Sequence, residues 1–88
     1  MTQAMHAPRR EDIAAARARI QGVAMRTPLV PSGDRPVWLK LEALQPYGSY
    51  KIRGAVNAVR ARLEREPDIR AVVSASAGNF GQAIAATA

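Results

Sequence analysis

The spacing of apolar residues predicts three helices. The first spans about Arg9 to Gly22, with acidic residues near its start, basic residues toward its end and a glycine that can stop it. The second begins near Tyr50 and stops before Pro67, and its apolar positions are Ile52, Ala55, Val56, Val59 and Leu63. The third covers Phe80–Ala86. Three residues share one face of the first helix, which we interpret as a packing surface: Ile13, Ala16 and Ile20.

Other apolar segments predict strands. Val37–Leu41 alternates between two faces as a short strand does, and it follows an extended, proline-rich segment at Arg26–Pro31. Ala71–Val73 is a continuous apolar run, which is typical of a strand covered on both faces. Strand, helix, strand and helix in this order predict an α/β fold with an open, mainly parallel sheet joined by right-handed crossovers.

Two strands do not complete such a sheet. The sequence therefore predicts the N-terminal part of a larger domain, truncated at its C-terminus, over residues 9–88. Residues 1–8 have no periodicity and end in a proline, so they are expected to form a flexible tail.

Composition narrows the class of protein. Of the 88 residues, 48% are hydrophobic and 23% are charged, a balance that favours a folded globular protein over a disordered one. The absence of cysteine excludes a disulfide framework and a thiolate metal site, and no metal site is predicted. No apolar run approaches the roughly 20 residues that span a bilayer. We therefore expect a soluble, cytoplasmic protein without membrane contact.

The net charge of +6 raises the possibility of a nucleic-acid partner. The arginines of the predicted helices are interrupted by acidic residues, and the aromatic residues are not interleaved with a basic stripe as base stacking requires. We expect no nucleic-acid partner. A small, noncatalytic basic binding module is the alternative from another class.

Two turns follow the predicted strands, at the edge where open α/β sheets bind ligands. The first, Gly48–Lys51, places a lysine at a helix start, where the positive end of the helix dipole disfavours the charged amine. A partly buried lysine there could act as a neutral nucleophile toward a carbonyl group, although a surface lysine is the ordinary interpretation of this spacing.

The second turn, Ser76–Asn79, combines a hydroxyl group, small residues and the free amides of a helix start. Such a loop can wrap a carboxylate, with Gly78 allowing close backbone approach and Asn79 offering both a donor and an acceptor. The same residues also form ordinary helix caps, so the pattern alone does not distinguish the two roles.

Five motifs, in order along the chain, together resemble the threonine/serine dehydratase family of pyridoxal-phosphate enzymes, which has the tryptophan-synthase-β-like fold. They are Arg26–Leu29, Lys40–Glu42, Gln45-Pro46, Gly48–Ala55 and Ser76–Gln82. The resemblance covers about residues 26–88 and makes residues 9–88 the start of a catalytic domain that binds pyridoxal 5'-phosphate. It also implies a small amino-acid substrate and a homo-oligomeric enzyme.

The resemblance implies a role for each site residue. Lys51 matches the lysine that forms the Schiff base and moves the α-proton, and Tyr50 stands where the family usually has a phenylalanine against the cofactor ring. Asn79 matches the asparagine that contacts the cofactor's phenolic oxygen. The substrate carboxylate would be bound by the loop residues Ser76, Ala77, Gly78 and Asn79. The implied reaction is β-elimination from L-threonine or L-serine to a 2-oxo acid and ammonia.

Two positions in these motifs distinguish the dehydratases from related enzymes of the same fold. The lysine is followed by Ile52-Arg53 rather than the Asp-Arg typical of cysteine and threonine synthases, which remain the alternatives within the fold. Ala77 stands where related serine racemases have a serine, so elimination is expected rather than racemisation. The phosphate-binding glycine-rich loop and the residue facing the pyridine nitrogen are expected beyond residue 88, so the 88-residue chain alone is expected to be inactive.

Overall fold

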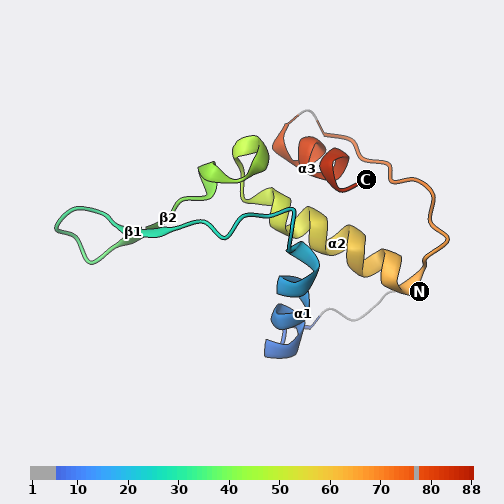
Figure 1. Ribbon diagram of the computed structural model, residues 1–88, viewed down its shortest axis with the longest axis horizontal. Coiled ribbons are helices and arrows are strands. Elements are labelled where there is room, and N and C mark those ends of the chain that lie inside the picture. Colours follow the sequence, from blue (N-terminus) through green and yellow to red (C-terminus); the bar gives the residue numbers. More distant parts are fainter. Residues whose placement is uncertain (1–5, 77) are drawn as a thin grey trace.

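The structure is a computed structural model that describes residues 6–76 and 78–88. Its helices are α1 (Arg10–Ile20), α2 (Lys51–Arg65) and α3 (Asn79–Thr87), and its strands are β1 (Leu29–Pro31) and β2 (Trp38–Lys40). Two short 3-10 turns, η1 (Glu42–Leu44) and η2 (Pro46–Gly48), connect β2 to α2. The three helices lie where the apolar spacing predicted them. Figure 1 shows α2 at the centre, with α3 along it and α1 crossing at one side.

A small apolar core holds the three helices together. Its buried residues are Ile52, Ala55, Val56 and Ala83. The first three recur at helical spacing on one face of α2, and the two alanines allow α2 and α3 to approach closely. Residues from the end of α1 and the turn after it pack against this core: Ile20, Val23 and Ala24.

The predicted packing face of α1 is only partly used. Ile20 packs against the core, whereas Ile13 is 61% exposed. The reason is geometric. The C-terminal end of α1 meets α2, and α1 extends away from α2 toward its own N-terminus (Figure 1).

Side-chain contacts fix the crossing of α1 and α2. The Arg19 guanidinium donates to both carboxylate oxygens of Glu64, at 3.1 and 2.9 Å, and to the Asn57 side-chain oxygen at 3.2 Å. Arg60 donates to the backbone oxygens of Arg19 and Gln21, which are carbonyls left without helical partners at the end of α1. These contacts attach the end of α1 to the middle and second half of α2.

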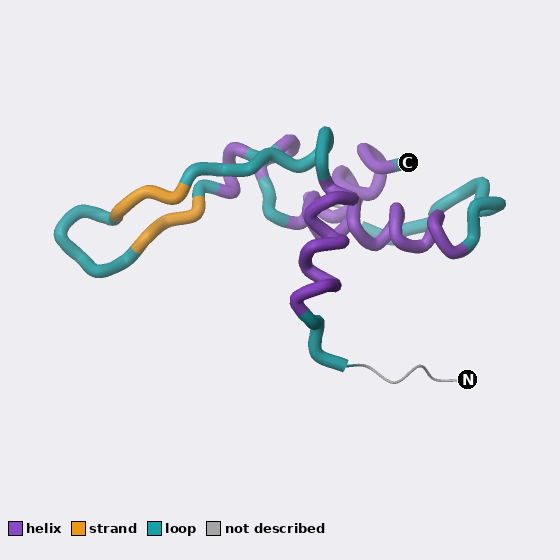
Figure 2. Tube along the Cα trace, turned by 60° about the horizontal axis from the view of Figure 1, so that its bottom comes forward, coloured by secondary structure: helices purple, strands orange, loops and turns teal. Residues whose placement is uncertain are grey.

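The strands differ from the expected sheet. β1 and β2 pair with each other in antiparallel register, with Val30 opposite Leu39, and the resulting hairpin projects away from the helices (Figures 1 and 2). The predicted strand at Ala71–Val73 is extended but unpaired, and Val73 is 96% exposed. That prediction is wrong for this structure, because a strand needs a neighbour to pair its backbone groups and none of the described residues provides one there. The expected parallel pairing is likewise not found among them.

Across the described residues, no helix has the length and apolar character needed to cross a bilayer.

Candidate active site

Lys51 is the first residue of α2, as the sequence predicted. The chain turns into this helix through Tyr47 and Gly48, which both have left-handed backbone conformations, with φ of 65° and 71°. The backbone N–H of Lys51 donates to the Ser49 hydroxyl at 3.3 Å. The Lys51 side chain is exposed rather than partly buried, because no described segment covers that face of the helix. Tyr50, just before it, is 64% exposed.

The second predicted turn leads into α3. The Ser76 hydroxyl oxygen accepts hydrogen bonds from the backbone N–H groups of Gly78, at 3.4 Å, and Gly81, at 3.2 Å. Ser76 therefore caps α3 in this structure, while its hydroxyl proton stays available as a donor. Asn79 is the first residue of α3, and Ala77 lies outside the described residues.

The fold brings these two turns into one region. α3 packs along α2 and also contacts η2, the turn that directly precedes Ser49-Tyr50-Lys51. Figure 1 shows the start of α3 beside η2. The exposed amine of Lys51 and the loop before α3 therefore belong to the same part of the molecule.

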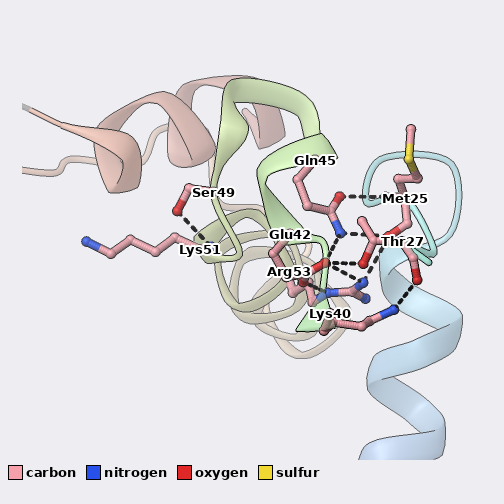
Figure 3. Close-up of polar contacts among 8 residues, drawn as sticks. All are labelled: Met25, Thr27, Lys40, Glu42, Gln45, Ser49, Lys51 and Arg53. Atoms are coloured by element: carbon pink, nitrogen blue, oxygen red, sulfur yellow. Dashed lines mark hydrogen bonds and ion pairs between the residues drawn. The ribbon is translucent and has the colours of Figure 1, made fainter. Parts of the chain in front are cut away.

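A polar cluster lies behind Lys51, centred on the Glu42 carboxylate (Figure 3). One carboxylate oxygen accepts from Arg53 Nε, and the other accepts from Arg53 Nη2, from the Thr27 hydroxyl and from Gln45 Nε2. Thr27 and Gln45 are each only 3% exposed. Both carboxylate oxygens of Glu42 are thus satisfied by side chains from three separate segments.

The cluster also ties down the segment between α1 and β1. The Gln45 side chain accepts from the backbone N–H of Met25 at 2.7 Å and donates to its carbonyl oxygen at 2.6 Å. Arg53 Nη2 donates to the same carbonyl at 2.9 Å, and the Lys40 amine donates to the carbonyl oxygen of Thr27. Lys40, one of two lysines in the chain, is therefore engaged in holding the backbone together.

The electrostatics follow from this geometry. The hydrogen bonds from Arg53 lower the pKa of Glu42 to about 2, with further lowering by those from Thr27 and Gln45, against an opposing effect of burial. The same pair raises the pKa of Arg53. Glu42 is accordingly a fixed anion at neutral pH rather than a candidate general base.

This cluster was not predicted from the sequence. Thr27, Glu42, Gln45 and Arg53 all lie within the five motifs, but their spacing along the chain does not show that they converge. The available signal was the presence of three hydrogen-bonding side chains in motifs to which no chemistry was assigned, together with Arg53 in the motif of Lys51.

Comparison with known proteins identifies the class. Residues 20–88 match the family described as pyridoxal-phosphate dependent enzyme, and the chain belongs to this family. Within it, the relatives confirm the resemblance to the threonine/serine dehydratases. The chain is 43% identical over 84 residues to an L-threonine ammonia-lyase of Thermotoga maritima, covering 89% of this chain and 21% of that protein.

Two further relatives show the range of names. A catabolic L-threonine dehydratase of Staphylococcus aureus is 40% identical over 84 residues, covering 88% of this chain and 24% of that protein. The serine racemase of Homo sapiens is 41% identical over 83 residues, covering 83% of this chain and 24% of that protein. The chain thus spans about a fifth to a quarter of the length of the curated relatives it matches. No solved structure matches it.

The cofactor of this family is pyridoxal 5'-phosphate. Two residues of this site carry the amine and the polar side chain that such a cofactor needs. Lys51 offers an exposed primary amine at a helix start, and Asn79 offers an amide in the neighbouring turn.

Proposed function

We propose that this chain is the N-terminal part of the catalytic domain of an enzyme that eliminates the β-hydroxyl group of L-threonine or L-serine. The products are a 2-oxo acid and ammonia. The observation that carries the proposal is the exposed Lys51 amine at the start of α2, in the same region as the Ser76–Asn79 loop. The names of the L-threonine ammonia-lyase and the L-threonine dehydratase support the choice of substrate class.

Each site residue has a proposed task. Lys51 Nζ would hold the cofactor through a covalent link and would afterwards carry the α-proton of the substrate. Asn79 would hold the cofactor's ring oxygen with its side-chain amide, and Tyr50 would pack beside the ring. Pyridoxal phosphate, when bound, supplies the electron sink for α-proton removal.

The loop before α3 is proposed to hold the substrate carboxylate. Ser76 retains a hydroxyl proton while its oxygen caps the helix, and the backbone amides of a helix start attract anions. The substrate is a small amino acid, and we propose a homo-oligomeric assembly for the complete enzyme.

Substitution of Lys51 tests the assignment of the Schiff-base lysine. In the complete protein, Lys51→Ala should abolish the covalent link between cofactor and chain that borohydride reduction makes permanent, and activity should be lost with it. Lys40→Gln is the matched control, because Lys40 is the other lysine of this chain and holds a backbone carbonyl. A borohydride-stable link that persists after Lys51→Ala would refute the proposal.

Serine racemases of similar identity make racemisation the second candidate. Racemisation needs an acid on the face opposite the lysine, and the methyl group of Ala77 has no proton to give. The complete protein should therefore convert L-serine or L-threonine to 2-oxo acid and ammonia with little D-amino acid. Chiral chromatography together with an ammonia assay measures both products, and D-serine formed as fast as pyruvate would favour racemisation instead.

A further inference from the structure

We propose that Arg53 and Glu42 are positioning residues that fix the first turn of α2 and thereby the direction in which Lys51 points. This inference rests on the proposed role of Lys51. Neither residue reaches the Lys51 amine, so their effect is transmitted through the backbone of the helix.

The helix geometry places the anchor behind the nucleophile. Arg53 follows Lys51 by two positions, which rotates its side chain by roughly 200° around the helix axis. Figure 3 shows the result, with Lys51 pointing away from the cluster in which Arg53 meets Glu42. A rotation of this turn about the helix axis that displaces Arg53 would therefore displace Lys51, on the opposite face, in the opposite direction.

The apolar core secures another face of the same turn. Ile52, between Lys51 and Arg53, is 1% exposed, and Ala55 and Val56 continue the buried face one turn later. These core side chains hold α2 against α3, but burial of apolar surface is non-directional and does not by itself fix the rotation of α2 about its axis. The Arg53–Glu42 contact supplies the directional restraint.

The contact between Arg53 and Glu42 fixes an orientation in addition to pairing opposite charges. Arg53 presents both Nε and Nη2 to Glu42, and the planar fork of a guanidinium matches a carboxylate in a fixed orientation. Thr27 and Gln45 hold the Glu42 carboxylate in turn. By contrast, Arg62 and Glu66 on the same helix form a single contact of 3.0 Å with side chains more than half exposed.

The functional demand matches this construction. A catalytic group needs to be held to within about 0.5 Å and 10–20° of its working geometry, usually by side chains that do not react themselves. Lys51 begins a helix and is covered by no described segment, so its own surroundings do not provide that restraint. The cluster behind it does.

Two conservative variants of the complete protein test the inference. Arg53→Lys keeps the charge but loses the fork, and Glu42→Gln keeps hydrogen-bonding capacity but loses the charge. The readout is the rate at which the cofactor-free protein forms a borohydride-reducible link after mixing with pyridoxal phosphate. We expect both variants to be roughly tenfold slower than the unmodified protein. In steady state, kcat should fall more than KM rises.

The matched control is Glu64→Gln, which breaks the two-pronged contact with Arg19 on the same helix, away from Lys51. It should lower thermal stability and leave the rate of link formation unchanged. Thr27→Val removes a single donor to Glu42 and should slow link formation by a smaller factor. This milder variant tests the inference if Arg53→Lys or Glu42→Gln does not fold.

The outcomes separate the two proposals. Link formation at the unmodified rate in Arg53→Lys, Glu42→Gln and Thr27→Val would overturn the positioning role. This would hold even if Lys51→Ala formed no link and the proposed function was thereby supported. Equal slowing in Glu64→Gln would also overturn it, because the effect would then be one of general stability. A link that survives Lys51→Ala would instead remove the proposed function on which this inference rests.

Discussion

At the residue scale, Glu42 shows how position in the fold changes the behaviour of an ordinary side chain. An isolated glutamate titrates near pH 4.5, and the hydrogen bonds from Arg53, Thr27 and Gln45 lower the pKa of Glu42 to about 2. The ionised carboxylate is therefore bound more strongly in the folded protein than in the unfolded chain, and this difference contributes to the free energy of unfolding.

The sign of this contribution sets a pH dependence. Because the folded-state pKa lies below the unfolded value, the stabilisation is present above about pH 4.5 and is lost as the pH falls toward 2. We expect Glu42→Gln to lower the free energy of unfolding by about 1–3 kcal/mol at pH 7, and the difference from the unmodified protein to shrink as the pH falls from 4.5 toward 2.

Urea unfolding of the complete protein at several pH values measures this difference. Glu66→Gln is the control, because its ion pair with Arg62 is exposed and should contribute less than about 0.5 kcal/mol. A Glu42→Gln deficit that stays constant from pH 7 to pH 2.5 would contradict the prediction, since it would then not depend on the ionised carboxylate.

At the scale of elements, α2 and α3 each contain a glycine, at Gly54 and Gly81, in different surroundings. A Cβ added to Gly54 would meet nothing within 4 Å. A Cβ added to Gly81 would lie 3.0 Å from the backbone oxygen of Ser76, and backbone atoms cannot rotate away as a flexible side chain can. Gly81 is therefore the residue that lets the loop carrying Ser76 lie against the first turn of α3.

Alanine substitutions at the two positions should have opposite effects. Gly54→Ala should raise the free energy of unfolding by about 0.5–1 kcal/mol through helix propensity. Gly81→Ala should lower it by about 1 kcal/mol, because the clash outweighs the same gain in propensity. Denaturant unfolding of the complete protein checks both values. An equal increase in the free energy of unfolding at the two positions would contradict the prediction, because the loop carrying Ser76 would then move away from the added methyl group without cost.

At the scale of the whole molecule, the chain buries little apolar surface. Only Ile52, Ala55, Val56 and Ala83 are buried hydrophobic residues in the described part of the chain, while Trp38, Val73 and Phe80 are exposed. The radius of gyration is 15.3 Å, compared with roughly 12 Å for a compact domain of this length. The projecting hairpin and the unpaired segment before α3 account for this extended shape (Figures 1 and 2).

The 88-residue polypeptide on its own should consequently be unstable and without catalytic activity. Its core is too small to offset the conformational entropy of folding, and its exposed apolar segments favour association. Differential scanning calorimetry and light scattering of the purified polypeptide should show no cooperative transition and a tendency to aggregate. A sharp thermal transition together with dehydratase turnover would be the opposite result.

The sequence by itself determined the local features of this protein. The three helices were predictable because apolar spacing and helix ends depend on near neighbours, and Lys51 at the start of α2 follows from the same pattern. The motifs from Arg26 to Gln82 were also sufficient to indicate the family, which the comparisons confirm.

Only the tertiary structure decided features that depend on distant segments. Ala71–Val73 has strand-like composition, yet strand formation requires a partner whose position no local pattern contains. The cluster around Glu42 joins Thr27, Gln45 and Arg53 from three segments, and the capping of α3 by Ser76 depends on the backbone approach at Gly81. Apolar periodicity is a property of adjacent residues, whereas hydrogen-bond partners and burial are properties of the folded arrangement. The sequence therefore placed Lys51 at the start of a helix, and only the fold showed the Glu42 cluster behind it.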